Sequence, residues 1–200
     1  MLRQFIRGQF TGFATLRIDI SRLGINIRQF ASALQELMSI HRPIAASHRI
    51  PTDARVAIVA ARFNGRFVDE LLRGATDRLK VHGLDGDRVE IHRVPGAFEL
   101  PVAAKQLIDT GRFGAVICLG CVIRGETAHF EYVAGEAARG IQQVAVSTGI
   151  PIIFGVLTTE NEAQTLDRLG GAHGHAGESA ADAAAEMLAL REQIAAGKQF

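Results

Sequence analysis

The sequence predicts an α/β fold, a three-layer αβα sandwich built around a four-stranded parallel sheet. Short apolar runs at residues 56–61, 89–94, 115–119 and 152–157 alternate with segments of helical periodicity, which is the pattern of parallel strands joined by right-handed crossover helices. The last run, Ile-Ile-Phe-Gly-Val-Leu, contains no polar residue, as expected of a strand covered on both faces. An open sheet of this size has exposed edges, so we also expect self-association.

Helices are predicted between and after these strands. The first has apolar residues four apart, at Phe67, Leu71, Ala75 and Leu79, and ends near Gly83, as an amphipathic helix with a glycine stop does. The second tolerates a proline because that proline falls in its first turn. The glycine-rich segment 170–177 is predicted to be a loop. The later helices are expected at residues 98–110, 129–148, 161–169 and 179–196.

Residues 1–53 are predicted to be an extension, followed by one domain at 54–200. Residues 1–50 hold seven arginines, no lysine and only two acidic residues. This composition resembles that of a transit peptide. We favour a disordered extension, or upstream sequence read from an early start codon, with Met38 as a sensible start.

Composition excludes several classes of partner. The net charge is +1 and no basic stripe is present, so no nucleic-acid partner is expected. No uncharged apolar stretch reaches the roughly 18 residues of a membrane span, so no membrane partner is expected either. Two cysteines, Cys118 and Cys121, are too few for a disulfide framework, which predicts a reducing, cytoplasmic location.

The ends of the predicted strands carry the residues that could do chemistry. Parallel strands bring their carboxyl ends to one edge of the sheet, where ligands bind in open α/β folds. Each residue alone has a structural explanation: Phe63 could lie in the core, Asn64 and Asn161 could cap helices, Glu99 could favour a helix start, and His129 could be an ordinary surface histidine. Unusual residues at all four strand ends together favour a site.

The most informative segment is 120–133, where an apolar strand gives way to glycine, arginine, threonine and histidine. The backbone N–H groups of the 125–127 turn would point outward from a helix start, which attracts anions. His129 can move protons near neutral pH. With the polar groups at the other strand ends, this set would hold a phosphate and a planar polar ring, for which Phe63 and Phe98 would form an aromatic platform.

Other chemistries are disfavoured. The three lysines lie on predicted helices or the tail, which argues against a Schiff base at a strand end. A nucleophile elbow, a Walker loop and a dinucleotide fingerprint are missing. Cys118 and Cys121, with His173 and His175, suggest a redox pair or a zinc site. We interpret Cys118 instead as a buried strand residue, because a redox thiolate normally lies at a helix start, and we expect no metal.

Four segments resemble the 6,7-dimethyl-8-ribityllumazine synthase family of riboflavin biosynthesis. They are Arg-Phe-Asn at 62–64, Val-Pro-Gly-Ala-Phe-Glu-Leu-Pro at 94–101, Gly-Cys-Val-Ile-Arg-Gly-Glu-Thr-Ala-His at 120–129 and Phe-Gly-Val-Leu-Thr-Thr-Glu-Asn at 154–161. The resemblance implies a flavodoxin-like strand order and a homo-oligomer, a pentamer that in some members assembles further into decamers or icosahedral shells. It also implies a reaction without cofactor, in which 5-amino-6-(D-ribitylamino)uracil and 3,4-dihydroxy-2-butanone 4-phosphate give the lumazine, phosphate and water.

The resemblance also implies a role for each site residue. Phe63 would stack on the pyrimidine ring, Glu99 would accept hydrogen bonds from the ribityl hydroxyls, and His129 would be the principal proton-transfer group. Phe154 and Arg168 would come from the adjacent subunit, with Arg168 binding the phosphate. The other implied contacts are Asn64, Ala97 and Phe98 around the ring and ribityl chain, Cys121, Val122 and Ile123 along the pyrimidine edge, and Gly125, Glu126 and Thr127 at the phosphate.

One position departs from the family pattern. Where family members carry Asn-Lys-Gly, this chain has His175, Ala176 and Gly177. Loss of the cation predicts a working but weakened enzyme, or transfer of the polarising role to His175 or water. Two alternatives stay open: a relative that forms shells or binds flavin-like rings without turnover, and a riboflavin synthase that dismutates two lumazines.

Overall fold

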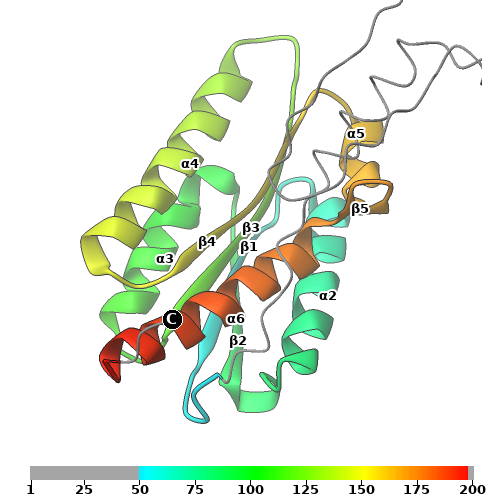
Figure 1. Ribbon diagram of the computed structural model, residues 1–200. Helices are drawn as coiled ribbons and strands as arrows, with labels where there is room; N and C mark the ends of the chain where they lie inside the picture. The colour runs from blue at the N-terminus through cyan, green and yellow to red at the C-terminus, as the bar shows by residue number, and fades with distance from the viewer. Residues whose placement is uncertain (1–49, 198–200) are drawn as a thin grey trace, which may run out of the picture. The chain divides into compact units, whose positions relative to one another are not determined.

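A computed structural model describes residues 50–197 and has a parallel sheet at its centre (Figure 1). The strand order is β2-β1-β3-β4, which confirms the predicted fold class. Ile58 of β1 lies in register between Ile91 of β2 and Ile117 of β3. The bounds are Val56–Ala61 for β1, Val89–Val94 for β2, Ala115–Ile123 for β3 and Ile152–Thr159 for β4.

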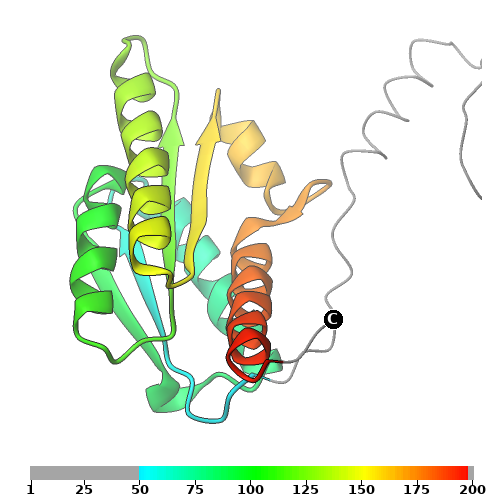
Figure 2. The same cartoon turned by 60° about the vertical axis from the view of Figure 1, so that its left-hand side comes forward.

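Helices cover both faces of the sheet, as Figures 1 and 2 show. α2 (Gly65–Val81) and α6 (Ala176–Ala195) lie on one face, and α3 (Leu100–Asp109) and α4 (His129–Thr148) lie on the other. Each face has its own apolar cluster, so the sheet is the middle layer of three. This arrangement leaves the strand ends as the place where loops from both layers meet.

The central strand β1 divides its side chains between the two layers. Val56, Ile58 and Ala60 pack in the cluster under α2 and α6, whereas the three residues between and after them pack under α3 and α4. Every residue of β1 is buried, which explains the continuous apolar run in the sequence. Opposite this strand, α2 buries the residues of its four-residue repeat: Phe67, Leu71, Ala75 and Leu79.

Two strands are longer than predicted. β3 ends at Ile123 rather than Leu119, and β4 ends at Thr159 rather than at residue 157. The extra residues pair across the sheet, with Val122 opposite Thr158. Interstrand pairing of this kind overrides the turn tendency that a glycine in the middle of an apolar run suggests. The first residues of the 120–133 segment therefore belong to the sheet.

Three shorter segments also differ from the prediction. The helix expected over 98–110 begins as a 3-10 turn, η3 (Ala97–Glu99), and Pro101 then falls in the first turn of α3. The expected loop at 170–177 forms the antiparallel hairpin β5 (Leu169–Gly171) and β6 (Gly174–His175), after which α6 starts at once. The remaining short elements are η2 (Gly86–Arg88) before β2 and α5 (Glu162–Asp167) after β4.

The start of α6 lies unusually close to α2. A Cβ atom added to Gly177 would stand 2.1 Å from the carbonyl oxygen of Leu71, and one added to Gly74 would stand 2.1 Å from Cε1 of His175. Both distances are far inside van der Waals contact, so only glycine fits at either point. The hairpin that precedes α6 is thereby held against α2.

The predicted extension at residues 1–53 falls largely on residues 1–49, which lie outside the described residues, so that assignment stays a prediction. Within residues 50–197, no helix combines the length and the apolar character needed to span a membrane.

Candidate active site

The first strand end places an aromatic ring at the surface. Pairing between β1 and β2 continues beyond both strands, because the N–H groups of Arg62 and Phe63 donate to the carbonyl oxygens of Val94 and Pro95 at 2.8 and 3.0 Å. The Phe63 side chain does not enter the core but is 69% exposed. The explanation of Phe63 as a core residue is therefore wrong, and its ring is free to stack on a ligand.

Asn64 joins the ends of β1 and β3. Its backbone has φ 56°, the left-handed conformation that asparagine tolerates better than most residues. Its side chain does not cap α2; Nδ2 donates to the carbonyl oxygen of Cys121 at 2.9 Å. The capping explanation holds instead for Asn161, whose Oδ1 accepts from the N–H of Gln164 at 2.9 Å at the start of α5.

The turn after β2 supplies a second aromatic ring and a carboxylate. Ala97 is buried, and a Cβ on Gly120 of β3 would stand 3.4 Å from its Cβ, so the turn packs directly on β3. Oε2 of Glu99 accepts from the N–H of Gly96 at 2.8 Å, which confirms a role for Glu99 at the helix start. Phe98 is exposed on the outer side of this turn.

The segment between β3 and α4 is an exposed turn that leads into a long helix. Residues 124–129 are exposed, and α4 starts at His129 as predicted. The N–H of His129 lies 3.4 Å from Oγ1 of Thr127, while Ala128, at the N-cap position, makes no side-chain cap. The turn and the first residue of this 20-residue helix are exposed, and the start of a helix is a suitable place for an anion.

Sequence reasoning missed a charged cluster beside this turn. The guanidinium of Arg124 donates from Nε to Glu160 and from Nη1 to Glu131, both at 2.6 Å. The hydrogen bonds to these carboxylates raise the pKa of Arg124 above its ordinary value. Arg124 and Glu131 both belong to the 120–133 segment, but Glu160 follows β4, so the complete cluster depends on the pairing of β3 with β4.

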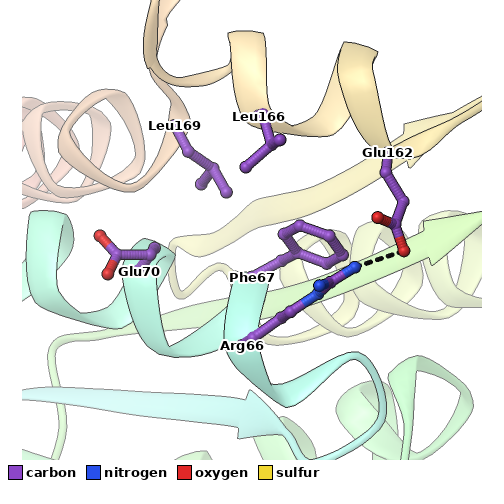
Figure 3. Close-up of a pocket in the computed structure, with 6 residues that line it drawn as sticks. All are labelled: Arg66, Phe67, Glu70, Glu162, Leu166 and Leu169. Carbon is purple, nitrogen blue, oxygen red and sulfur yellow. Dashed lines mark ion pairs between the residues drawn. The ribbon is translucent and has the colours of Figure 1, made fainter.

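Two cavities in the described part of the chain lie away from these residues. One, of about 420 Å³, lies between α2 and α5, where Arg66 forms an ion pair with Glu162 over Phe67 (Figure 3). The other, of about 430 Å³, lies between the end of α6 and the segment before β1, with Pro51 and Arg191 in its wall. The predicted site residues line neither cavity. The exposed ones among them, which include Phe63, Phe98 and His129, lie on the surface at the carboxyl ends of the strands.

The sequence model of the 6,7-dimethyl-8-ribityllumazine synthase family matches residues 53–192. The chain belongs to this family. Membership implies the condensation that forms 6,7-dimethyl-8-ribityllumazine in riboflavin biosynthesis, and it confirms the resemblance seen in the sequence. The match spans every strand of the sheet and all of the predicted site residues.

Two residues expected to serve a neighbouring lumazine synthase subunit lie apart from the others. Phe154 pairs in register with Cys118. It is the third residue of β4 and does not lie at the carboxyl end of the strand, and its ring is 43% exposed. Arg168 follows α5, and its Nη1 donates to the carbonyl oxygen of Gln164 at 3.0 Å. The roles of both residues stay predictions.

At the position where the resemblance implies a lysine, the chain has an alanine next to a buried histidine. Ala176 is the first residue of α6, and the ring of His175 is 8% exposed and packs against Gly74. Nδ1 of His175 accepts from the N–H of Gly177 at 3.2 Å. A ring held in this way cannot swing toward the strand ends, so the suggestion that His175 replaces the lysine is not supported.

The cysteines of this lumazine synthase chain do not form a redox pair or a metal site. Burial raises the pKa of Cys118 to about 12 and that of Cys121 to about 11. Both thiols therefore stay protonated near neutral pH. Within residues 50–197, no group of three or more histidine, cysteine or acidic side chains is arranged to hold a metal ion.

Proposed function

We propose that the surface at the carboxyl ends of the strands is where this chain condenses the ribitylaminouracil with the butanone phosphate. The observation that carries the proposal is the hydrogen-bonded joining of three strand ends, through Phe63 to Pro95 and through Asn64 to Cys121. These hydrogen bonds make the joined strand ends a rigid surface, here called the floor of the site, on which two substrates can be oriented. Orientation is a large part of the catalysis of a bimolecular step.

The pyrimidine would bind on the side of the floor that carries the aromatic rings. Phe63 would stack on the ring, with Asn64, Ala97 and Phe98 around the ring and the ribityl chain. The backbone of the β3 end would read the pyrimidine edge. Glu99, held through one carboxylate oxygen by Gly96, would accept hydrogen bonds from ribityl hydroxyls. The residues of β3 whose backbone would contact the pyrimidine edge are Cys121, Val122 and Ile123.

The phosphate would bind at the turn before α4, through Gly125, Glu126 and Thr127. His129, the first residue of the helix, would move the protons. The substrate amine attacks the ketone carbonyl, and loss of water gives an imine. Elimination of phosphate then requires that a proton leave the adjacent carbon. An exposed imidazole beside the bound phosphate can take that proton and return one to a leaving oxygen.

The site would be completed by a second copy of the chain, in a pentamer or a larger assembly. Two features support this proposal. The site surface is open rather than enclosed, whereas small-ligand sites are normally concave. Large apolar side chains are also exposed around the helices, including Val102, Tyr132 and Val146, as at protein interfaces. The neighbour would contribute Phe154 and Arg168.

Free cysteines support a reducing, cytoplasmic location.

The proposal is tested by mixing both substrates and following the fluorescent lumazine. We expect product from the wild type, a fall in kcat of about 100-fold for His129→Ala, and little change for His92→Ala, a histidine of β2. Ring binding without product would support the non-catalytic relative, which the alanine at position 176 favours. Product from lumazine alone would instead indicate the dismutase.

Subunit mixing tests the shared site. Chains carrying Phe63→Ala and chains carrying Arg168→Ala would each be weakly active alone. Co-assembled after joint unfolding and refolding, they would regain activity, because some interfaces then pair an intact Phe63 with an intact Arg168. Absence of any recovery in mixed assemblies of confirmed composition would contradict the shared site, as would a fully active monomer in light scattering.

A further inference from the structure

Arg124 connects three elements around the turn that leads to His129. Its backbone N–H donates to the carbonyl oxygen of Thr159 at 2.9 Å, which fixes the end of β3 to the end of β4. Its side chain donates from Nε to Glu160, just after β4, and from Nη1 to Glu131, in the first turn of α4. The residue before the turn is thus tied to the helix after it.

An aromatic ring fixes the plane of the guanidinium. Cζ of Arg124 lies 4.2 Å from the ring centre of Phe130, within the range of a cation–π contact. A single ion pair at the surface contributes little. Here two carboxylates and a ring hold one planar group, whose hydrogen-bond directions are fixed relative to each other, in a way that lysine cannot reproduce.

The carboxylates also outweigh the charge of Arg124. One guanidinium faces both Glu131 and Glu160, so the cluster as a whole carries one net negative charge and adds no positive charge beside the turn. A free arginine next to those groups would add strong attraction for phosphate, including the phosphate that the reaction releases. The arrangement suits a residue that fixes the turn and does not itself bind the anion.

We propose that Arg124 is a positioning residue, which holds the anion-binding turn and His129 at a fixed distance from the strand ends, while Glu131 and Glu160 keep its charge away from the phosphate. The inference rests on the proposed function, because it concerns the same turn. A displacement of about 1 Å can cost a reaction two orders of magnitude in rate, so a tether outside the site can control turnover.

The first experiment compares three variants by steady-state kinetics. Arg124→Ala should lower kcat by at least about tenfold and raise the KM for butanone phosphate severalfold, with the KM for the pyrimidine unchanged. Arg124→Lys keeps the charge and loses the double hydrogen bond, so its kcat should fall similarly while the KM for butanone phosphate stays near that of the wild type. Arg139→Ala, on the outer part of α4 with only a 3.7 Å contact to Glu136, is the matched control and should behave as wild type.

The second experiment measures inhibition by inorganic phosphate. Glu160→Gln keeps an oxygen that can accept from Nε and removes the negative charge, so the inhibition constant of phosphate should fall about threefold, whereas Arg124→Ala should raise it. A purely structural tether would raise the constant in Arg124→Ala and leave it unchanged in Glu160→Gln. Thermal unfolding shows whether each variant is folded, and the lysine and glutamine variants stand in if the alanine variant is not.

The outcomes separate the two proposals. A wild type that makes no lumazine overturns the proposed function. An active wild type in which the Arg124 and Arg139 variants have equal kinetics overturns the positioning role. If Glu160→Gln leaves the inhibition constant of phosphate unchanged, the proposal that the carboxylates keep the charge of Arg124 from attracting phosphate is overturned.

Discussion

Nδ2 of Asn64 donates to the carbonyl oxygen of Cys121 at 2.9 Å, across 57 residues of sequence. The bond joins the first and third strands at the edge where the site residues gather. Because the asparagine backbone is left-handed, with φ 56°, its side chain leaves the direction of a normal cap and reaches the neighbouring strand. One residue thus sets both the turn and the spacing of two strand ends.

Three variants of Asn64 separate these roles. Asn64→Gly keeps the left-handed backbone and loses the bond, so we expect a loss of about 1 kcal/mol in the free energy of unfolding. Asn64→Ala adds a backbone cost of about 1 kcal/mol. Asn64→Asp tolerates the backbone but places a carboxylate against a carbonyl oxygen. Urea unfolding at one protein concentration measures the free energy of unfolding of each variant, and steady-state kinetics measures its KM for the pyrimidine. Equal stability of the glycine and alanine variants would contradict the backbone argument.

Two glycines in helices should respond to alanine with opposite signs. Gly177→Ala drives a methyl group against the carbonyl of Leu71, 2.1 Å away, and should cost at least about 2 kcal/mol. Gly135→Ala, on α4, meets nothing within 4 Å and should stabilise the chain by about 0.5–1 kcal/mol through helix propensity. Thermal melts of both proteins give the comparison, and a Gly177→Ala protein as stable as wild type would show that α6 is not fixed against α2.

Asp182 should make stability depend on pH in the acid range. Burial alone would raise its pKa, but the hydrogen bonds from Arg78 and His82, both 2.6 Å long, more than offset burial and lower it. The stabilisation is therefore present above the ordinary pKa of aspartate and is lost as pH falls through the lowered value. Asp182→Asn should cost about 1–2 kcal/mol at pH 7.

The difference between Asp182→Asn and wild type should shrink steadily as urea unfolding is repeated at lower pH. Asp109→Asn, which removes an exposed partner of Lys105 on α3, is the control and should change stability by less than about 0.5 kcal/mol. A constant difference across the acid range would mean that the carboxylate charge is not what stabilises the contact between α2 and α6.

Both cysteines should resist alkylation in the native protein. With pKa values raised to about 12 for Cys118 and about 11 for Cys121, neither supplies a reactive thiolate at pH 7.5, and both side chains are buried. Mass spectrometry after iodoacetamide treatment should find no adduct in the folded protein and two after unfolding in urea. Rapid native labelling of Cys121 would contradict its burial at the end of β3.

Restoring the family's lysine should improve substrate binding. Ala176→Lys adds a cation at the first residue of α6, a half-buried position, and we expect kcat/KM to rise severalfold through electrostatic attraction. A few tenths of a kcal/mol of stability should be lost, because a cation is unfavourable at a helix start. Steady-state kinetics on both substrates decide the point, with Ala176→Gln as the neutral control of similar length. Unchanged turnover and KM would show that the missing charge is irrelevant.

The sequence predicted the elements whose signals are local. β1 could be bounded correctly because each of its residues faces one of two apolar layers. The ends of β3 and β4 could not, since Gly120 reads as a turn until Val122 is known to face Thr158. The hairpin β5–β6 has too few residues for an alternating pattern, and its strands follow from pairing alone.

The candidate site shows the same division. Phe63, Glu99 and His129 could be singled out because strand ends gather side chains at one edge. The bond from Asn64 to Cys121 and the cluster around Arg124 depend on contacts between distant segments, which no local pattern reveals. Phe154 and Arg168 were named through the family resemblance only, and their partners would lie on another chain.

The close glycine contact between α2 and α6 affects how the protein can be altered. Because no side chain lies between the backbones of Leu71 and Gly177, no side chain there can change its rotamer to accommodate a movement of one helix against the other. Engineering of α6 therefore has to treat α2 and the hairpin β5–β6 as a single unit with it, and adjustable parts are better sought on the opposite side of the sheet.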